Sequence, residues 1–470
     1  MEGAMVVSET RAENNLGGPI RSMRDLIELL DRSGELVRVK RPVHRDTELM
    51  AVLKRAQTEL KKAVLFENVE GTDFRYVGNL FGGRDKLARI FGVREEDVVT
   101  EWIRRFHAER LKPVPVDFPP GQEVVHKGDI NVREILPIPH QYRGDAAPFI
   151  NSAVVVAKDP KTKTYNASFN RMQLRDGNRL GIQLVINMDL FFIHKEAEQR
   201  GQPVEVAAVI SPDPYLFLAA ATRVPREVDE IEYAGALAGY PMEMVKCKSV
   251  DLEVPASAEI VIEGRILPNT YIEEGPMGEV LQYYGSTSPK PVFEVSAITH
   301  REKPIMQTLL TGTIEDHTLC GVPIEMELLP MLRKVAPCVR NVSLLPFFLI
   351  AVIQVDDVQP TQRGIGKNIA MAALAHPWIK IAVVVDKDVN IYDMEDVFWA
   401  IATRVDFDRD VLRVPDTFGF PLDEMKQSRD APITRMGIDA TVDPLVKSRF
   451  ERARPNGYEQ IRLKDYLEEE

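Results

Sequence analysis

Cysteine is scarce in this chain, and the few positions that it occupies exclude functions that depend on paired thiols. The 470 residues contain only Cys247, Cys320 and Cys338. None of the three belongs to a C-x-x-C pair, so the sequence supports neither a disulfide framework nor a cysteine-ligated zinc site. Chains without paired cysteines are typical of reducing compartments, and we therefore expect a cytoplasmic protein.

Long apolar runs are missing as well. No uncharged apolar segment approaches the 18 residues that a membrane-spanning helix needs, and residues 1–18 lack the apolar centre of a signal peptide. The net charge is -12, from 71 acidic and 59 basic side chains. Because such a surface repels nucleic acids and anionic membranes, we expect neither as a partner. Any phosphate-bearing ligand must then be met by local basic side chains or by a metal ion.

The bulk composition is that of a folded protein with more than one core. Hydrophobic residues make up 44% of the chain and charged residues 28%. A chain of this length is too long for one compact core, so we expect two or three domains. Residues 1–125 alternate helical and strand patterns, which predicts an N-terminal α/β domain. Its expected elements are a helix capped by Ser22, strands at 34–40 and 63–69, a helix at 47–62 and a proline-rich connector at 112–121.

The middle of the chain is rich in strand patterns and its last third alternates strands with helices. Residues 126–313 contain β-type runs at 151–157, 179–187, 204–210, 258–266 and 292–300, and this spacing predicts a barrel or a sandwich. A connecting helix is expected at 314–335. Residues 336–440 predict a C-terminal α/β domain with buried strands at 347–355 and 379–386 and helices at 366–375 and 395–403. The charged residues 441–470 form a tail, and the fold class is α+β with several domains.

Five polar residues stand out inside the β-rich region: Asn166, Arg171, Glu230, Glu274 and Glu279. Acidic side chains on the inner face of a barrel are costly unless they are paired or bind a metal ion. Taken alone, the segment EGPMGE at 274–279 is also typical of a tight turn with two solvated carboxylates.

The order of five motifs identifies a family. These are GDINVREILPIPHQ at 128–141, N-x4-R at 166–171, E-x3-AGAL at 230–237, EGPMGE at 274–279 and GIDAT at 437–441. In this order they resemble the UbiD family of prenylated-FMN-dependent (de)carboxylases over nearly the whole chain. The resemblance implies a central split β-barrel that binds the flavin, and a homodimer or a homohexamer. It also implies a flavin prenyltransferase as the supplier of the cofactor.

The resemblance implies a metal-anchored flavin. Asn166 and Glu230 match side chains that ligate a divalent ion, Mn2+ (or Mg2+), which binds the phosphate of the prenylated FMN; oxygen ligands suit these ions. A nearby K+ would sit on backbone carbonyls around Ala219, Ala220 and Thr222, and Lys367 is a candidate second charge on the phosphate. The other cofactor contacts implied are Ser168, Phe169, Asn170, Arg171, Gln183, Leu184, Met188 and Asp189.

One metal position departs from the family pattern. Many members carry a histidine eighteen residues after the arginine, and here Asp189 occupies that position. Three alternatives stay open: Asp189 ligates through its carboxylate, His194 reaches the metal ion instead, or water fills the place. A carboxylate would give the site one more negative charge than usual, which bears on its choice of metal.

The catalytic set implied by the resemblance is Arg171, Glu274 and Glu279. Arg171 presents a planar, permanently charged fork that can position a carboxylate substrate. Glu279 is expected to protonate the carbon from which carbon dioxide leaves. That role needs a carboxyl group that is protonated near neutral pH, which Glu274 and a dry pocket would favour while Arg171 opposes it.

The function implied is reversible, non-oxidative decarboxylation of an α,β-unsaturated or (hetero)aromatic carboxylic acid. One alternative is an anhydromevalonate phosphate decarboxylase of isoprenoid synthesis, as in archaeal relatives that the chain resembles, with Arg143 and Arg301 as candidate cations for the substrate phosphate. Another is a non-catalytic flavin-binding or assembly subunit, which the change at Asp189 would favour. His140, His300 and His317 lie near the expected pocket by sequence order, and each is more typical of a structural histidine.

Overall fold

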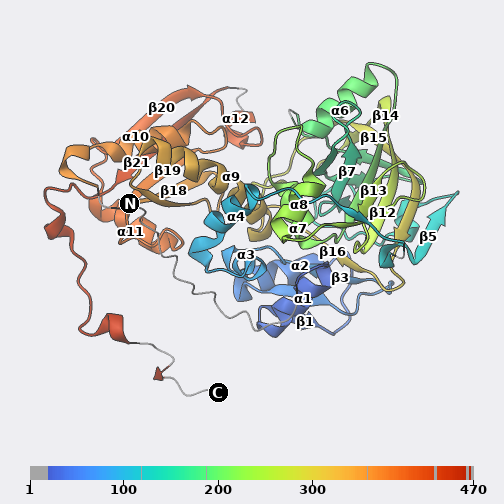
Figure 1. Ribbon diagram of the computed structural model, residues 1–470, viewed down its shortest axis with the longest axis horizontal. Coiled ribbons are helices and arrows are strands. Elements are labelled where there is room, and N and C mark those ends of the chain that lie inside the picture. Colours follow the sequence, from blue (N-terminus) through green and yellow to red (C-terminus); the bar gives the residue numbers. More distant parts are fainter. Residues whose placement is uncertain are drawn as a thin grey trace, which may run out of the picture.

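The computed structural model describes residues 19–117, 119–186, 188–356, 358–427, 431–461 and 465–466. Within these residues the chain has a mixed α+β fold, with three regions visible in Figure 1. The N-terminal region lies below, the large central sheet lies on one side, and the C-terminal region lies on the other. No helix in the described residues is both long enough and apolar enough to cross a membrane.

The N-terminal region is an α/β unit completed by a strand from far along the chain. Its sheet has the order β1-β2-β3-β16, and the last strand is Ile305–Gln307, which pairs in parallel with β3. The expected first helix is present, because the Ser22 side chain accepts a hydrogen bond from the Asp25 N–H at its start. The elements are α1 (Met23–Arg32), β1 (Leu36–Val39), α2 (Leu49–Arg55), a π-helical turn (Ala56–Leu60), β2 (Ala63–Phe66), β3 (Arg75–Gly78), α3 (Arg84–Phe91) and α4 (Val98–Phe106).

The central region is a curled sheet that forms a half-barrel around two long antiparallel strands, β14 (Ile260–Glu274) and β15 (Ser288–His300). Its strand order is β6-β9-β10-β15-β14-β11-β7-β8, and β5 adds to the edge of β15. The expected strand at 179–187 is shorter than predicted, because β10 ends at Ile182. The remaining strands are β5 (Val124–Lys127), β6 (Phe149–Ile150), β7 (Val154–Lys158), β8 (Tyr165–Phe169), β9 (Met172–Leu174), β10 (Arg179–Ile182) and β11 (Val204–Ile210).

Short helices and a small sheet surround the half-barrel. The helices are α5 (Val132–Ile135), α6 (Asp189–Glu198), α7 (Pro214–Ala221) and α8 (Glu230–Ala238). The small sheet has the order β13-β12-β4 and contains β4 (Val114–Pro115), β12 (Glu243–Lys246) and β13 (Glu253–Pro255).

A long helix, α9 (Ile314–Val335), leads into the C-terminal α/β region. The sheet there has the order β17-β18-β19-β21-β20. Its β18 begins at Ile350 and not at the predicted residue 347, since the rings of Phe347 and Phe348 leave the sheet and pack against His317 of α9. The elements are β17 (Val339–Ser343), β18 (Ile350–Val355), α10 (Ile365–Leu374), β19 (Ile381–Asp386), α11 (Met394–Arg404), β20 (Val411–Thr417), α12 (Glu424–Gln427) and β21 (Ile433–Ala440).

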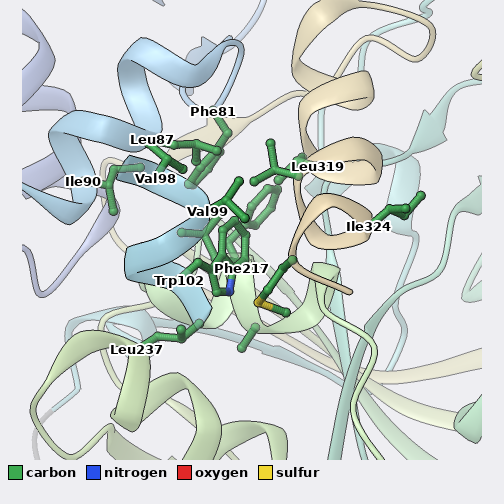
Figure 2. Packing of buried hydrophobic residues seen from close by; sticks show 14 of the residues in the cluster. Phe81, Leu87, Ile90, Val98, Val99, Trp102, Phe217, Leu237, Leu319 and Ile324 are labelled. Carbon is green, nitrogen blue, oxygen red and sulfur yellow. The ribbon is translucent and has the colours of Figure 1, made fainter. Parts of the chain in front are cut away.

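One continuous apolar core joins the three regions. Figure 2 shows side chains of α3, α4, α7 and α9 meeting, with Phe217 of the central region stacked on Phe81 at a centroid distance of 4.7 Å. A buried ion pair between Arg84 of α3 and Glu325 of α9 crosses the same junction. Glu325 also accepts a hydrogen bond from the Leu344 N–H at 2.6 Å. Through these contacts α9 packs against both the N-terminal region and the central region.

Candidate active site

The register of the curled sheet places a row of polar side chains on one of its faces. Gln173 pairs with Gly181, and the Gln183 N–H donates to the Arg171 carbonyl at 3.0 Å, so β9 and β10 present these residues on one side. A Cβ on Gly181 would lie 3.8 Å from the Glu274 Cβ, which puts Glu274 on the same face. This face of β9, β10, β14 and β15, which carries Arg171, Gln173, Gln183 and Glu274, is called the polar face and lines the candidate site.

The polar face brings together the three residues of the predicted catalytic set. Arg171 Nε donates to Glu274 Oε1 at 2.8 Å, and Arg171 Nη1 donates to Glu279 Oε1. The Glu274 side chain is 0% exposed, while that of Glu279 is 13% exposed. Glu274 is therefore sealed behind the arginine, and of the two carboxylates only Glu279 can meet a ligand from solvent.

The electrostatics of this network follow from its burial. Burial raises the pKa of Glu274, and the Arg171 guanidinium and the Lys290 ammonium oppose that rise. Burial in turn lowers the pKa of Lys290, against the attraction of Glu274 and Glu279. Glu274 Oε2 and both amide atoms of Gln173 have no hydrogen-bond partner among the described residues. Buried polar atoms without partners are rare in folded proteins, and here they mark a face built for a ligand.

The EGPMGE segment is held by contacts that its own motif does not reveal. The Gly278 N–H donates to Asp145 Oδ1 at 2.8 Å, and a Cβ on Gly278 would lie only 2.4 Å from the Tyr142 ring. A Cβ on Gly285 would lie 2.6 Å from Glu279 Oε1. Both glycines are needed for close approach, and the segment is not the solvated turn that its composition alone allows.

The predicted metal ligands Asn166 and Glu230 lie side by side. Asn166 Nδ2 donates to Glu230 Oε1 at 3.0 Å, and both side chains are buried. The local fold explains the pairing: Asp229 caps the start of α8 and also accepts from the Tyr165 N–H at 2.8 Å, which fixes this helix end against β8. Asn166 follows Tyr165 and Glu230 follows Asp229, so this contact brings the two residues of the pair close together.

The chemistry of this pair fits a cation. Burial, together with the nearby Asp189 carboxylate, raises the pKa of Glu230 to about 8. A buried carboxylate whose charge is disfavoured by a second carboxylate needs a positive partner, and hard cations take such oxygens. An asparagine ligates through its amide oxygen, which a half-turn of the Asn166 side-chain amide would present to a cation shared with Glu230.

Asp189, and not His194, lies toward this pair. Asp189 begins α6, and its charge acts on Glu230. His194 lies on another side of α6, where its Nε2 is 3.4 Å from the Leu267 carbonyl of the strand β14 segment and its ring is buried. The geometry therefore offers no support for His194 as the replacement ligand. Among the described residues, no cluster of three or more His, Cys, Asp or Glu side chains could hold a metal ion, so any site here needs the Asn166 amide.

Basic side chains near the pair were missed by sequence reasoning. The Arg223 and Arg226 charges both act on Asp189. Arg226 is engaged in ion pairs with Asp159 at 2.6 Å and Glu196 at 3.1 Å, while Arg223 is exposed. Neither Arg223 nor Arg226 belongs to a motif, so no sequence signal pointed to them.

Lys367, the predicted phosphate contact, lies on α10, and its Nζ donates to the Arg409 carbonyl within the C-terminal region.

The remaining predicted cofactor contacts lie along β8, the β8–β9 turn and the β10–α6 connection. Asn170 Nδ2 donates to Ser168 Oγ at 2.9 Å, and Ser168 Oγ donates to Asn166 Oδ1 at 3.3 Å. Gln183 Oε1 is buried without a partner among the described residues. The others are Phe169, whose ring packs on Phe217, the buried Leu184, and Met188, which precedes α6. Ala219 and Ala220 lie in the last turn of α7 and Thr222 is its C-cap, so their carbonyls lie at the negative end of a helix dipole.

Two residues placed near the pocket by sequence order are not there. Arg301 pairs with the buried Glu259 at 3.3 Å, and His300 pairs with Ile260 at the start of β14. Glu274 ends the same strand, on the order of 40 Å away along a strand of this length. Arg301 was therefore wrong as a candidate for the pocket, because β15 runs away from the site over its whole length. His300 instead contacts His126 and the Arg301 carbonyl, in agreement with the structural role expected of it.

The other candidates sit near the EGPMGE segment. Arg143 is exposed in the turn beside Tyr142. The two nitrogens of His317 each lie 2.9 Å from a carbonyl oxygen, one of Val280 and one of Pro346. The His140 N–H donates to Asp46. His317 thus positions the chain next to Glu279, and its nitrogens are engaged with backbone.

Comparisons with known proteins agree with this geometry. Residues 27–106, 113–314 and 317–440 match the family models of the N-terminal, Rift-related and C-terminal domains of 3-octaprenyl-4-hydroxybenzoate carboxy-lyase (UbiD). An anhydromevalonate phosphate decarboxylase of Methanosarcina mazei is 35% identical over 434 residues, which cover 92% of this chain and 98% of the relative.

Solved structures show the same likeness. The UbiD-class enzyme HmfF from Pelotomaculum thermopropionicum, in complex with FMN, is 38% identical with a TM-score of 0.89, over 95% of this chain and 100% of that one. An evolved dimeric form of HmfF in complex with prFMN is 36% identical with a TM-score of 0.84, over the same shares. Three consecutive family domains and relatives of full length show that this chain belongs to the UbiD family of carboxy-lyases.

Proposed function

We propose that this chain decarboxylates an α,β-unsaturated or (hetero)aromatic carboxylic acid with a prenylated FMN anchored by Mn2+ (or Mg2+). The observation that carries the proposal is the Arg171 fork, which holds the buried Glu274 on one side and the accessible Glu279 on the other. One acid is sealed and one can reach a ligand, as a reaction that ends in protonation requires.

The chain's own residues divide the work. Arg171 is permanently charged and orients the acid, while Glu274 fixes the guanidinium plane by a charge-assisted bond from behind. Glu279 faces the ligand side and delivers a proton to the carbon that loses carbon dioxide. Gly285 leaves room for that carboxyl group.

The residues present fit the flavin and its metal ion. Asn166, Glu230 and Asp189 would hold the divalent ion against the flavin phosphate, Arg223 offers a further positive charge, and carbonyls around Ala219 would hold K+. The amide of Gln173 and the amide oxygen of Gln183, which have no partner among the described residues, suit the polar edge of a flavin ring. When bound, a prenylated flavin supplies the electron sink that the departing carboxylate needs.

A second, narrower candidate is decarboxylation of anhydromevalonate phosphate. Curated relatives with this name match at 35% and 32% identity over 90% or more of the chain. The non-catalytic alternative has no support from the site, because Arg171, Glu274 and Glu279 are joined as one network.

The test begins with the cofactor. The chain is co-expressed with a flavin prenyltransferase, and the purified protein is examined for its visible flavin spectrum and its metal content. We expect flavin and manganese in near-equal amounts, and Glu230→Ala should lose both together. A colourless wild-type protein under these conditions, or a Glu230→Ala protein that keeps both, contradicts the proposal.

A further inference from the structure

Lys290 occupies the polar face of the sheet, at the centre of its width. It lies on β15 directly opposite Ile272 of β14, two residues before Glu274. On the other edge of β15, Val292 pairs with Gly181, so the same register continued by two residues brings Lys290 beside Gln183. Across the strands, Lys290 therefore lies in one row with Gln183 and Arg171.

The ammonium group of Lys290 has no direct partner. It makes no hydrogen bond and no ion pair within 4 Å among the described residues, although the side chain is half-buried. The charges that act on it are those of Glu274, Arg171 and Glu279. The Lys290 ammonium group is thus partly desolvated, lies beside Arg171 and the two glutamates, and is open to a contact with an anionic ligand.

The arginine of the network is largely occupied already. Arg171 gives its Nε to Glu274 and its Nη1 to Glu279, which leaves Nη2 as its unengaged end. When Glu279 carries the proton that it donates, Arg171 and Lys290 supply two positive charges against the single negative charge of Glu274. One positive charge is then left for an anionic ligand, and Lys290 is the group that is free to contact it.

We propose that Lys290 binds an anionic group of the substrate and so helps to select acids for this site. This rests on the proposed decarboxylase function, which it deepens by adding a substrate-binding residue that no family motif marks. The anionic group is either the reacting carboxylate or a second group, such as a phosphate or a further carboxylate, and both offer the same oxygens to an ammonium group.

The kinetic test compares Lys290→Met, Lys290→Arg and the control Lys246→Met as flavin-loaded enzymes. Lys246 is exposed on β12, in the small separate sheet. Each enzyme is assayed for carbon dioxide release with anhydromevalonate phosphate and the same acid without its phosphate, and with furan-2,5-dicarboxylate and 2-furoate. For Lys290→Met we expect KM to rise about tenfold to a hundredfold with kcat within about threefold, since one charge-assisted bond is lost. Lys290→Arg should recover most of the loss, and Lys246→Met should match the wild type.

The pattern across substrates identifies the source of the anion. An equal rise in KM for both members of a pair assigns Lys290 to the reacting carboxylate. A rise confined to the doubly anionic member assigns it to the second group. Unchanged KM values for every acid that the wild type converts overturn the inference, as does a loss confined to kcat with a shifted pH profile, because that would make Lys290 a regulator of the glutamates.

A binding measurement separates this inference from the proposed function. Isothermal titration with glutarate, an unreactive dicarboxylate, gives dissociation constants for the purified wild type and for Lys290→Met. We expect binding to be at least tenfold weaker in the variant, whether or not the wild type releases carbon dioxide. Equal dissociation constants overturn the role of Lys290. If the flavin-loaded wild type converts no acid but still binds glutarate more tightly than Lys290→Met does, only the proposed reaction is contradicted.

Discussion

The affinity of the proposed metal site should depend steeply on pH, because its central ligand holds a proton in the absence of a cation. Burial and the Asp189 carboxylate raise the pKa of Glu230 from 4.5 to about 8. A carboxylate ligand must be ionised to bind, so the metal ion has to displace this proton. We therefore expect Mn2+ binding to strengthen as the pH rises toward 8, and one proton to be released for each ion bound below that pH.

The magnitude follows from the ionised fraction of Glu230. With a pKa of about 8, roughly 1% of the site is ionised at pH 6 and half at pH 8, which makes the apparent affinity about fiftyfold weaker at pH 6. This corresponds to about 2.3 kcal/mol. The stability of the metal-free protein should change in the opposite direction to metal affinity. Because the pKa of Glu230 is higher in the folded state than in the unfolded state, this protein loses stability as the pH rises from about 4.5 through about 8.

The assay is isothermal titration of the metal-free protein with Mn2+ between pH 6 and pH 8, in two buffers of different ionisation enthalpy to count protons. Glu230→Gln is the matched variant, since it keeps the size of the side chain but has no proton to lose. It should bind weakly at every pH in this range. Affinity that is flat with pH in the wild type, or binding without proton release at pH 6, would refute the reasoning.

Three further perturbations test the network and its support. Gly285→Ala places a Cβ 2.6 Å from Glu279 Oε1, so the carboxyl group must shift. We expect kcat to fall at least about tenfold with little change in the melting temperature. Turnover at the wild-type rate would show that the position of this carboxyl group is not critical. Glu274→Gln removes the charge that holds Arg171 Nε, and we expect kcat to fall about tenfold or more at unchanged flavin absorbance, which stopped-flow or steady-state assays would measure. Arg84→Met leaves Glu325 buried without its partner and should cost about 3–5 kcal/mol in urea denaturation, most of which Arg84→Met/Glu325→Leu should recover; additive losses would contradict the pairing.

Local patterns in the sequence predicted many elements but not how distant strands pair. The Ser22 cap, the alternating strand at 36–39 and the apolar strand at 381–386 each depend on neighbouring residues, and each is present. The pairing of β16 with β3 joins segments more than 200 residues apart, as does the support of α3 by Glu325. Such pairings are set by tertiary packing, which hydrophobic periodicity does not encode.

The site residues that belong to a family motif were predictable from the sequence, and the site residues outside any motif were not. Arg171 and the two glutamates lie 103 and 108 residues apart in sequence, and the ordered motifs still brought them into one hypothesis. Lys290 and Arg223 belong to no motif, and only the strand register and the electrostatics reveal them. The prediction that Arg301 lies near the pocket was wrong because it was based on sequence order alone. The thirteen residues of β15 separate Arg301 from the site and place it at the far end of the sheet.

The central claim is that Glu279 protonates the product of a flavin-dependent decarboxylation. The most direct measurement is carbon dioxide release by wild type and Glu279→Gln, both purified after co-expression with a flavin prenyltransferase and matched for flavin absorbance. The account predicts release by the wild type from at least one unsaturated or aromatic acid, and a rate about a hundredfold to ten-thousandfold lower in the variant. Equal rates in the two proteins, or no release by a flavin-loaded wild type across the acids tested, would contradict it.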